Sequence, residues 1–140
     1  MEYVKSFRDL EVYKLSRQLS GIIFEISKKF PKEEMYSITD QIRRSSRSVG
    51  AQIAEAWGKR KFEKHFVSKL TDADAEQLET QHWIETAFDC SYVSKETSVD
   101  LIKKYSSIGK MLNSMINKAE SFCTDHRITA SITEEPDSEY

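Results

Sequence analysis

Proline is almost absent from this chain, and its absence constrains the fold more than any other feature. The two prolines, Pro31 and Pro136, enclose 104 residues that contain none. Proline is excluded from helix interiors, so a long proline-free stretch is typical of continuous helices. Four glycines in 140 residues are too few to supply the turns of a β-sandwich or β-barrel. The sequence therefore predicts an all-α protein with a single domain large enough to bury a core.

Amphipathic segments account for most of the chain, with apolar residues recurring every three or four positions. These segments span residues 7–29, 37–58, 61–91 and about 95–122. The short connections between them are typical of neighbouring antiparallel helices. We therefore expect an up-down-up-down four-helix bundle over residues 1–123. Residues 124–140 lack periodicity and contain five acids and one arginine, which predicts an acidic, disordered tail.

Local signals predict where the helices begin and end. Ser37, followed three residues later by Asp40, resembles a capping box and predicts the start of the second helix. Gly58 predicts the end of that helix, as a residue in left-handed conformation just past the last turn. Positions 45–51 are rich in small residues, which predicts close packing against a neighbouring helix. The apolar spacing of the last segment continues to Phe122 and predicts one unbroken helix.

The cysteine content and the short apolar runs indicate in which cellular compartment the protein is found. Cys90 and Cys123 are too few for a disulfide framework. If they end successive antiparallel helices, about 28 helical residues or ~42 Å separate them, whereas a disulfide needs Cα atoms within ~7 Å. We therefore expect thiols in a reducing cytoplasm. The longest apolar run is residues 22–24, which predicts no membrane span, and the first five residues contain no apolar signal segment.

Catalytic motifs are missing from the sequence. Glu79 and His82 lie three residues apart, as in helical-bundle di-iron sites, but the second pair that such a site needs is absent, because His65 follows Phe62. No Gly-x-Ser-x-Gly turn, Cys-x-x-Cys motif, glycine-rich phosphate loop or His-Glu-x-x-His motif occurs. We therefore expect a protein that is not an enzyme, with no metal, no cofactor and no small-molecule substrate.

Charge is segregated along the second and third predicted helices. Eight basic and two acidic residues lie between Arg43 and Lys69, whereas six acidic residues and no Lys or Arg lie between Leu70 and Ser94. The net charge of −2 is unlike that of a strongly basic nucleic-acid-binding protein, but a local basic patch suits phosphate groups. The candidate residues for contact with RNA or DNA are Arg43, Arg44, Arg47, Lys59, Arg60, Lys61 and Lys64.

Intramolecular ion pairs are the alternative role for these arginines. If the second and third helices form a hairpin about residues 58–60, the numbers of facing residues sum to about 119. Arg47 then faces Asp72, and Arg43 faces Glu76. The run from Lys59 to Lys61 opposes the dipole at the start of the third helix, which leaves it available for an anion.

Several separated motifs also occur in a specific order. They are Phe7-Arg8-Asp9-Leu10 with Tyr13, Phe30-Pro31 with Glu34 and Tyr36, Gln41-Ile42-Arg43-Arg44, Ser48, Ile53-Ala54-Glu55 and Glu79-Thr80-Gln81. In this order they resemble the 23S rRNA intervening-sequence protein family, over about residues 7–122. The chain departs from the family pattern at Gln52, where Asn is usual, and at Ala56, where Gly is usual.

The resemblance implies an antiparallel four-helix bundle that assembles into a homopentamer. The chain is similar in this respect to an accessory protein of diversity-generating retroelements, which looks like a pentameric barrel that binds nucleic acid and a reverse transcriptase. We therefore expect a homo-oligomeric scaffold or accessory protein associated with RNA or DNA. The alternative is a protein–protein adaptor with no nucleic-acid role. Ile102, Gly109 and Ile116 widen the apolar stripe of the last helix, which favours contact with a second copy.

Overall fold

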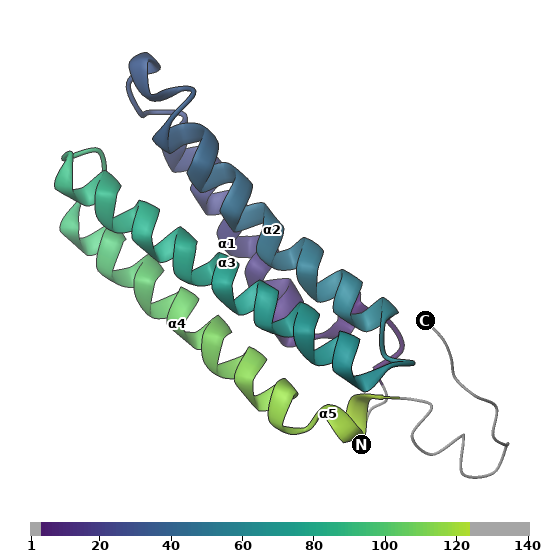
Figure 1. Ribbon diagram of the computed structural model, residues 1–140. Helices are drawn as coiled ribbons and strands as arrows, with labels where there is room; N and C mark the ends of the chain where they lie inside the picture. Colours follow the sequence, from purple (N-terminus) through teal and green to yellow (C-terminus); the bar gives the residue numbers. More distant parts are fainter. Residues whose placement is uncertain (1–3, 124–140) are drawn as a thin grey trace, which may run out of the picture.

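Four long helices make up the computed structural model, which describes residues 4–123. They are α1 (Glu11–Ser27), α2 (Ile38–Gly58), α3 (Glu63–Asp89) and α4 (Lys95–Asn117). Three one-turn elements accompany them, namely η1 (Phe7–Asp9), η2 (Lys32–Glu34) and α5 (Ala119–Phe122). Each long helix runs antiparallel to the one before it (Figure 1). The predicted all-α bundle is therefore confirmed, whereas the predicted tail over residues 124–140 lies outside the described residues.

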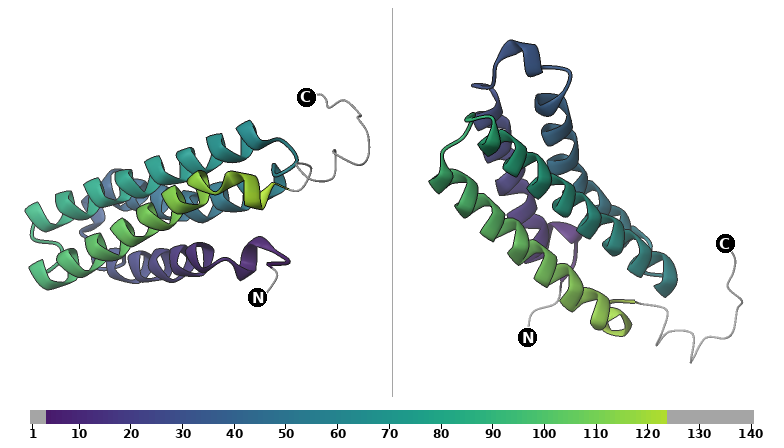
Figure 2. Two further views of the ribbon diagram at one scale, coloured as in Figure 1. Left: turned by 90° about the horizontal axis from the view of Figure 1, so that it is seen from below. Right: turned by 60° about the vertical axis from the view of Figure 1, so that its left-hand side comes forward.

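The connections gather at the two ends of the bundle. The α2–α3 turn and α5 lie at one end, and η2 and the α3–α4 turn lie at the other (Figures 1 and 2). Cys90 follows α3 and Cys123 follows α5, so the 23 residues of α4, about 35 Å of helix, lie between them. The two cysteines form no disulfide, as the sequence predicts.

The core is a row of aliphatic and aromatic side chains from all four long helices. Its largest fully buried members include Leu19, Ile53, Phe66, Tyr105 and Leu112. α2 packs most extensively against α3, whereas α1 and α4 meet less closely and leave an apolar groove of about 260 Å³. No helix within residues 4–123 combines the length and the apolar character needed to cross a membrane.

The predicted helix ends are partly wrong. The Ser37 hydroxyl donates to the Glu34 carboxylate at 2.6 Å instead of capping α2, so Ser37 and Asp40 form no capping box. Gly58 is the last helical residue of α2, and no glycine within residues 4–123 has a positive φ. The last helix is also interrupted, because the chain turns at Lys118 before α5.

Candidate nucleic-acid interface

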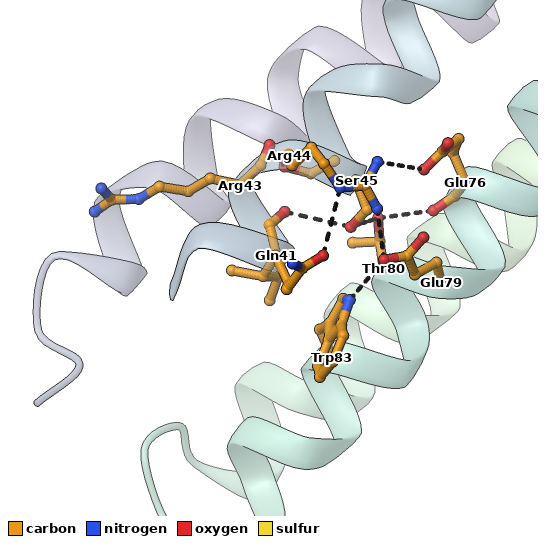
Figure 3. A network of polar contacts seen from close by, with 10 residues as sticks. Gln41, Arg43, Arg44, Ser45, Glu76, Glu79, Thr80 and Trp83 are labelled. Carbon is orange, nitrogen blue, oxygen red and sulfur yellow. Dashed lines mark hydrogen bonds and ion pairs between the residues drawn. The ribbon is translucent and has the colours of Figure 1, made fainter. Parts of the chain in front are cut away.

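Arg44 points from α2 toward the acidic face of α3 (Figure 3). Its guanidinium lies 3.4 Å from the Glu76 carboxylate and 2.5 Å from that of Glu79. The indole Nε1 of Trp83 donates to the same Glu79 oxygen at 2.9 Å. The hydrogen bonds from Arg44 and then from Trp83 lower the pKa of Glu79, and the bond to Glu79 raises the pKa of Arg44. Arg44 is therefore occupied in joining α2 to α3.

A buried polar pair supports this ion pair from inside the bundle. The hydroxyls of Ser45 and Thr80 lie 2.8 Å apart, and both residues are fully buried. Thr80 also donates to the Glu76 carbonyl at 2.9 Å, and the Ser45 hydroxyl lies 3.5 Å from the Ile42 carbonyl, so either hydroxyl can be the donor between them. The hydrogen bond between these two buried hydroxyls favours the observed register of α2 against α3, because any other register loses it.

Arg43 and Arg47 point to the opposite side of α2. The Nε of Arg43 donates to the Ser27 hydroxyl of α1 at 2.7 Å, and its guanidinium lies 4.7 Å from the centre of the Phe24 ring. The Arg47 guanidinium lies 5.3 Å from the same ring. Figure 3 shows Arg43 extending away from Arg44 and its two carboxylates.

The predicted pairs Arg43–Glu76 and Arg47–Asp72 are therefore wrong, since the described residues show neither. Pairing by residue number gives the height of a residue along a hairpin but not its direction around the helix axis. Consecutive residues of an α-helix point about 100° apart, so Arg44 faces α3 while Arg43 faces α1.

A double-mutant cycle distinguishes the two arginine roles. We expect Arg44→Met and Glu79→Gln to be coupled by about 0.5–1 kcal/mol, the value for a half-exposed ion pair. The matched cycle of Arg47→Met and Asp72→Asn is expected to show coupling near zero. Both are measured by urea unfolding. Coupling as strong in the second cycle as in the first would contradict the observed orientation of α2.

The remaining basic candidates lie at the α2–α3 turn. The Arg60 guanidinium lies 3.6 Å from the centre of the Trp57 ring, and its Nε donates to the Trp57 carbonyl at 2.9 Å. Burial lowers the pKa of Arg60. Lys61 and Lys64 are exposed, and Lys59 is half-buried at the end of α2. Arg60 thus closes the end of α2, whereas the lysines beside it remain accessible.

Glu79 and His82 both contact neighbouring side chains of the bundle. Glu79 accepts from Arg44 and Trp83, and the His82 ring contacts the Trp83 ring edge-on with centres 4.6 Å apart. Within the part of the chain that the structure describes, no three His, Cys, Asp or Glu side chains gather in a way that would hold a metal ion.

A groove between α1 and α2, here called the arginine groove, was not predicted. It has a volume of about 380 Å³. It is lined by Phe7, Tyr13, Ser16, Arg17, Ser20, Ser46, Arg47, Gly50, Ala51 and Ala54. Sequence reasoning included Arg47 but missed Arg17 and Tyr13. The available signal was the spacing of Tyr13, Arg17, Ser20 and Phe24, which places these residues on one face of α1.

The predicted site residues thus form three groups rather than one patch. Arg43 and Arg47 lie on the α1 side of α2, Arg44 lies on the α3 side, and the others lie at the α2–α3 turn. Twelve residues separate Arg47 from Lys59, which is about 18 Å along a helix. Among residues 4–123, Arg44 is the member of the seven that forms an ion pair with a carboxylate.

These features define a small antiparallel helical bundle with arginines on two sides of one helix. The chain belongs to the 23S rRNA-intervening sequence protein family, whose model matches residues 8–114. It is also similar to the crystal structure of a protein of unknown function from the S23 ribosomal protein family of Bacteroides thetaiotaomicron VPI-5482. The two are 29% identical with a TM-score of 0.68, over 76% of this chain and 95% of that chain. No curated protein matches the sequence.

Proposed function

We propose that this protein is a non-catalytic, cytoplasmic accessory or scaffold protein that contacts RNA or DNA through α2 and the α2–α3 turn. One observation carries the proposal. Six of the seven predicted basic residues have no carboxylate partner among residues 4–123, Arg44 being the exception. Accessible cations without a carboxylate partner are the groups that exchange bound counterions for phosphates. Arg44 is left out of the proposed interface because its charge is neutralised by Glu76 and Glu79.

A homo-oligomer is the proposed assembly, and the resemblance to the family favours a pentamer. Three large apolar side chains on α3 and α4 support contact with another protein surface. Leu78 and Val99 are each 55% exposed, and Phe88 is 40% exposed. The same observation favours the second candidate function, a protein–protein adaptor that binds no nucleic acid.

A binding titration at two salt concentrations tests the proposed function. Labelled structured RNA is the first probe, because the family takes its name from a sequence within 23S rRNA, and duplex DNA is the second. If four of the six cations contact phosphates, the affinity is expected to fall by about 50- to 150-fold between ~50 and ~200 mM salt. Replacing Lys59, Lys61 and Lys64 by Glu is expected to abolish binding by removing contacts and adding repulsion, while keeping the Arg60–Trp57 stack.

The matched control reverses three exposed lysines of α4 instead. Replacing Lys95, Lys103 and Lys110 by Glu changes the net charge equally and is expected to leave most of the affinity. Equal losses in both triple variants would show that only net charge matters. If neither the RNA nor the DNA binds at ~50 mM salt, the nucleic-acid role is contradicted and the adaptor function is left.

A further inference from the structure

The arginine groove brings together cations whose neighbours are aromatic rings rather than carboxylates. Arg17 lies 5.9 Å from the centre of the Tyr13 ring and donates to the Tyr13 hydroxyl at 3.2 Å. Arg47, which lines the groove, and Arg43, which lies beside it, are 5.3 and 4.7 Å from the centre of the neighbouring Phe24 ring. Within residues 4–123 none of these three arginines forms an ion pair with a carboxylate. The groove therefore keeps its positive charge available to a ligand.

Several small residues of α1 and α2 line the groove beside the arginines and the aromatic rings. A Cβ at Gly50 would lie 3.2 Å from the Ser16 hydroxyl and 3.6 Å from the Tyr13 ring, which shows how closely α1 and α2 approach there. Ala51 and Ala54 also line the groove along α2. The volume of about 380 Å³ lies in the range of pockets that hold small organic groups.

We propose that the arginine groove binds single-stranded nucleic acid, with Arg17 and Arg47 contacting phosphates and Tyr13 stacking against a base. The inference deepens the proposed function and rests on it. In a duplex the faces of the bases are stacked on each other, whereas a single strand presents them to aromatic rings and guanidinium planes. The Phe24 ring lies beside the Arg47 guanidinium, and this contact lowers the entropy lost when that side chain binds.

The groove also leads toward the other unpartnered cations. Phe7 of η1 lines the groove, and η1 contacts α2 near the end of the bundle that carries the α2–α3 turn. From Arg43 to Lys59 is sixteen residues, about 24 Å along α2. A strand that leaves the groove at this end therefore approaches the end of the bundle that carries the α2–α3 turn.

A fluorescein-labelled oligouridine of about twenty nucleotides tests this inference by fluorescence anisotropy. Ala51→Glu places a carboxylate in the groove at an exposed position, one helical turn from Arg47, and is expected to weaken binding by at least about tenfold. The matched control is Ala75→Glu, at an exposed position of α3 that does not line the groove, and it is expected to have little effect. Arg17→Gln is expected to reduce the slope of log affinity against log salt by about 0.7, the value of one lost phosphate contact on a single strand.

A second pair of variants tests the contribution of the Tyr13 ring to binding. Tyr13→Leu keeps an apolar contact with Phe7 but removes the ring, and about tenfold weaker binding is expected. Tyr36→Leu is the control, because Tyr36 is 92% exposed and lies at the opposite end of the bundle. Unfolding curves for all variants establish that each one folds.

The outcomes distinguish failure of the groove from failure of the proposed function. If oligouridine binds and Ala51→Glu and Ala75→Glu weaken it equally, the groove assignment is overturned and the nucleic-acid role stands. If duplex DNA binds more tightly than the oligouridine, the preference for single strands is overturned. If no nucleic acid binds at ~50 mM salt, both the groove assignment and the proposed function are overturned.

Discussion

Replacing Phe66 by alanine is expected to lower the free energy of unfolding by about 3–5 kcal/mol. Phe66 lies in α3, is fully buried and stacks on Phe122 of α5, with ring centres 5.8 Å apart. The substitution removes a ring from the core and also the surface on which α5 rests. For a domain of this size, the expected fall in melting temperature is about 10–15 °C.

Phe88→Ala is the matched control, because Phe88 lies on the same helix but is 40% exposed. Its truncation is expected to cost less than about 1 kcal/mol, since a half-exposed ring loses little burial. Thermal melts of both variants are recorded at a low protein concentration at which the chain is monomeric, because Phe88 belongs to the proposed contact surface and the stability of an oligomer depends on concentration. Equal losses for Phe66 and Phe88 would contradict the described packing of α5 against α3.

Tyr105→Phe is expected to stabilise the protein by about 1 kcal/mol at neutral pH. The Tyr105 hydroxyl is completely buried and has no hydrogen-bond partner among residues 4–123. A buried donor without a partner loses its hydration and gains nothing in return, and phenylalanine removes that cost while keeping the shape. The free energy of unfolding from urea titration measures the gain. A loss of stability would show that the hydroxyl is hydrogen-bonded in solution.

The stabilisation by Tyr105→Phe is expected to grow at alkaline pH. Burial raises the pKa of Tyr105 above the value of about 10 that it has in the unfolded chain. The folded state therefore holds the hydroxyl proton more tightly than the unfolded chain does. The stability that this tighter binding contributes is complete below pH ~10 and is lost as the pH rises toward the pKa of the folded state. Above pH ~10 the gap between variant and wild type widens by about 1.4 kcal/mol per pH unit. A gap that is constant between pH 7 and pH 11 would contradict this.

Tyr92 does not disturb that comparison. Its hydroxyl donates to Glu34 at 2.7 Å, and this hydrogen bond raises the pKa of Tyr92 to about 12. The shift is present in both proteins, so it cancels in the difference between them.

Helix number and order could be predicted from the sequence, because they depend on apolar spacing and on the missing prolines. The helix ends could not be predicted equally well. The chain turns at Lys118 because Phe122 packs on Phe66, a residue more than fifty positions away. Ser37 has the right identity for a cap, but the nearby Glu34 carboxylate takes its hydroxyl. Both departures result from contacts with other side chains, and the spacing of apolar residues carries no information about such contacts.

The candidate site could be predicted in composition but not in arrangement. The sequence identifies Arg43, Arg44 and Arg47 as one group on α2. In the structure, Arg43 and Arg47 face α1, whereas Arg44 faces α3. The α1 side of the groove was missed because Tyr13 and Arg17 are ordinary residues for an exposed helix face. Only the packing of α1 on α2 at Gly50 brings them opposite Arg47.

The division of adjacent arginines between α1 and α3 makes α2 intolerant of insertions. A single extra residue in the first half of α2 rotates everything on one side of it by about 100° relative to the other. Arg44 would then leave the carboxylates of α3, and the Ser45 hydroxyl would turn away from Thr80 at the same time. Length polymorphism is therefore expected in the turns of this fold, while α2 keeps a fixed residue count between its first turn and Ser45.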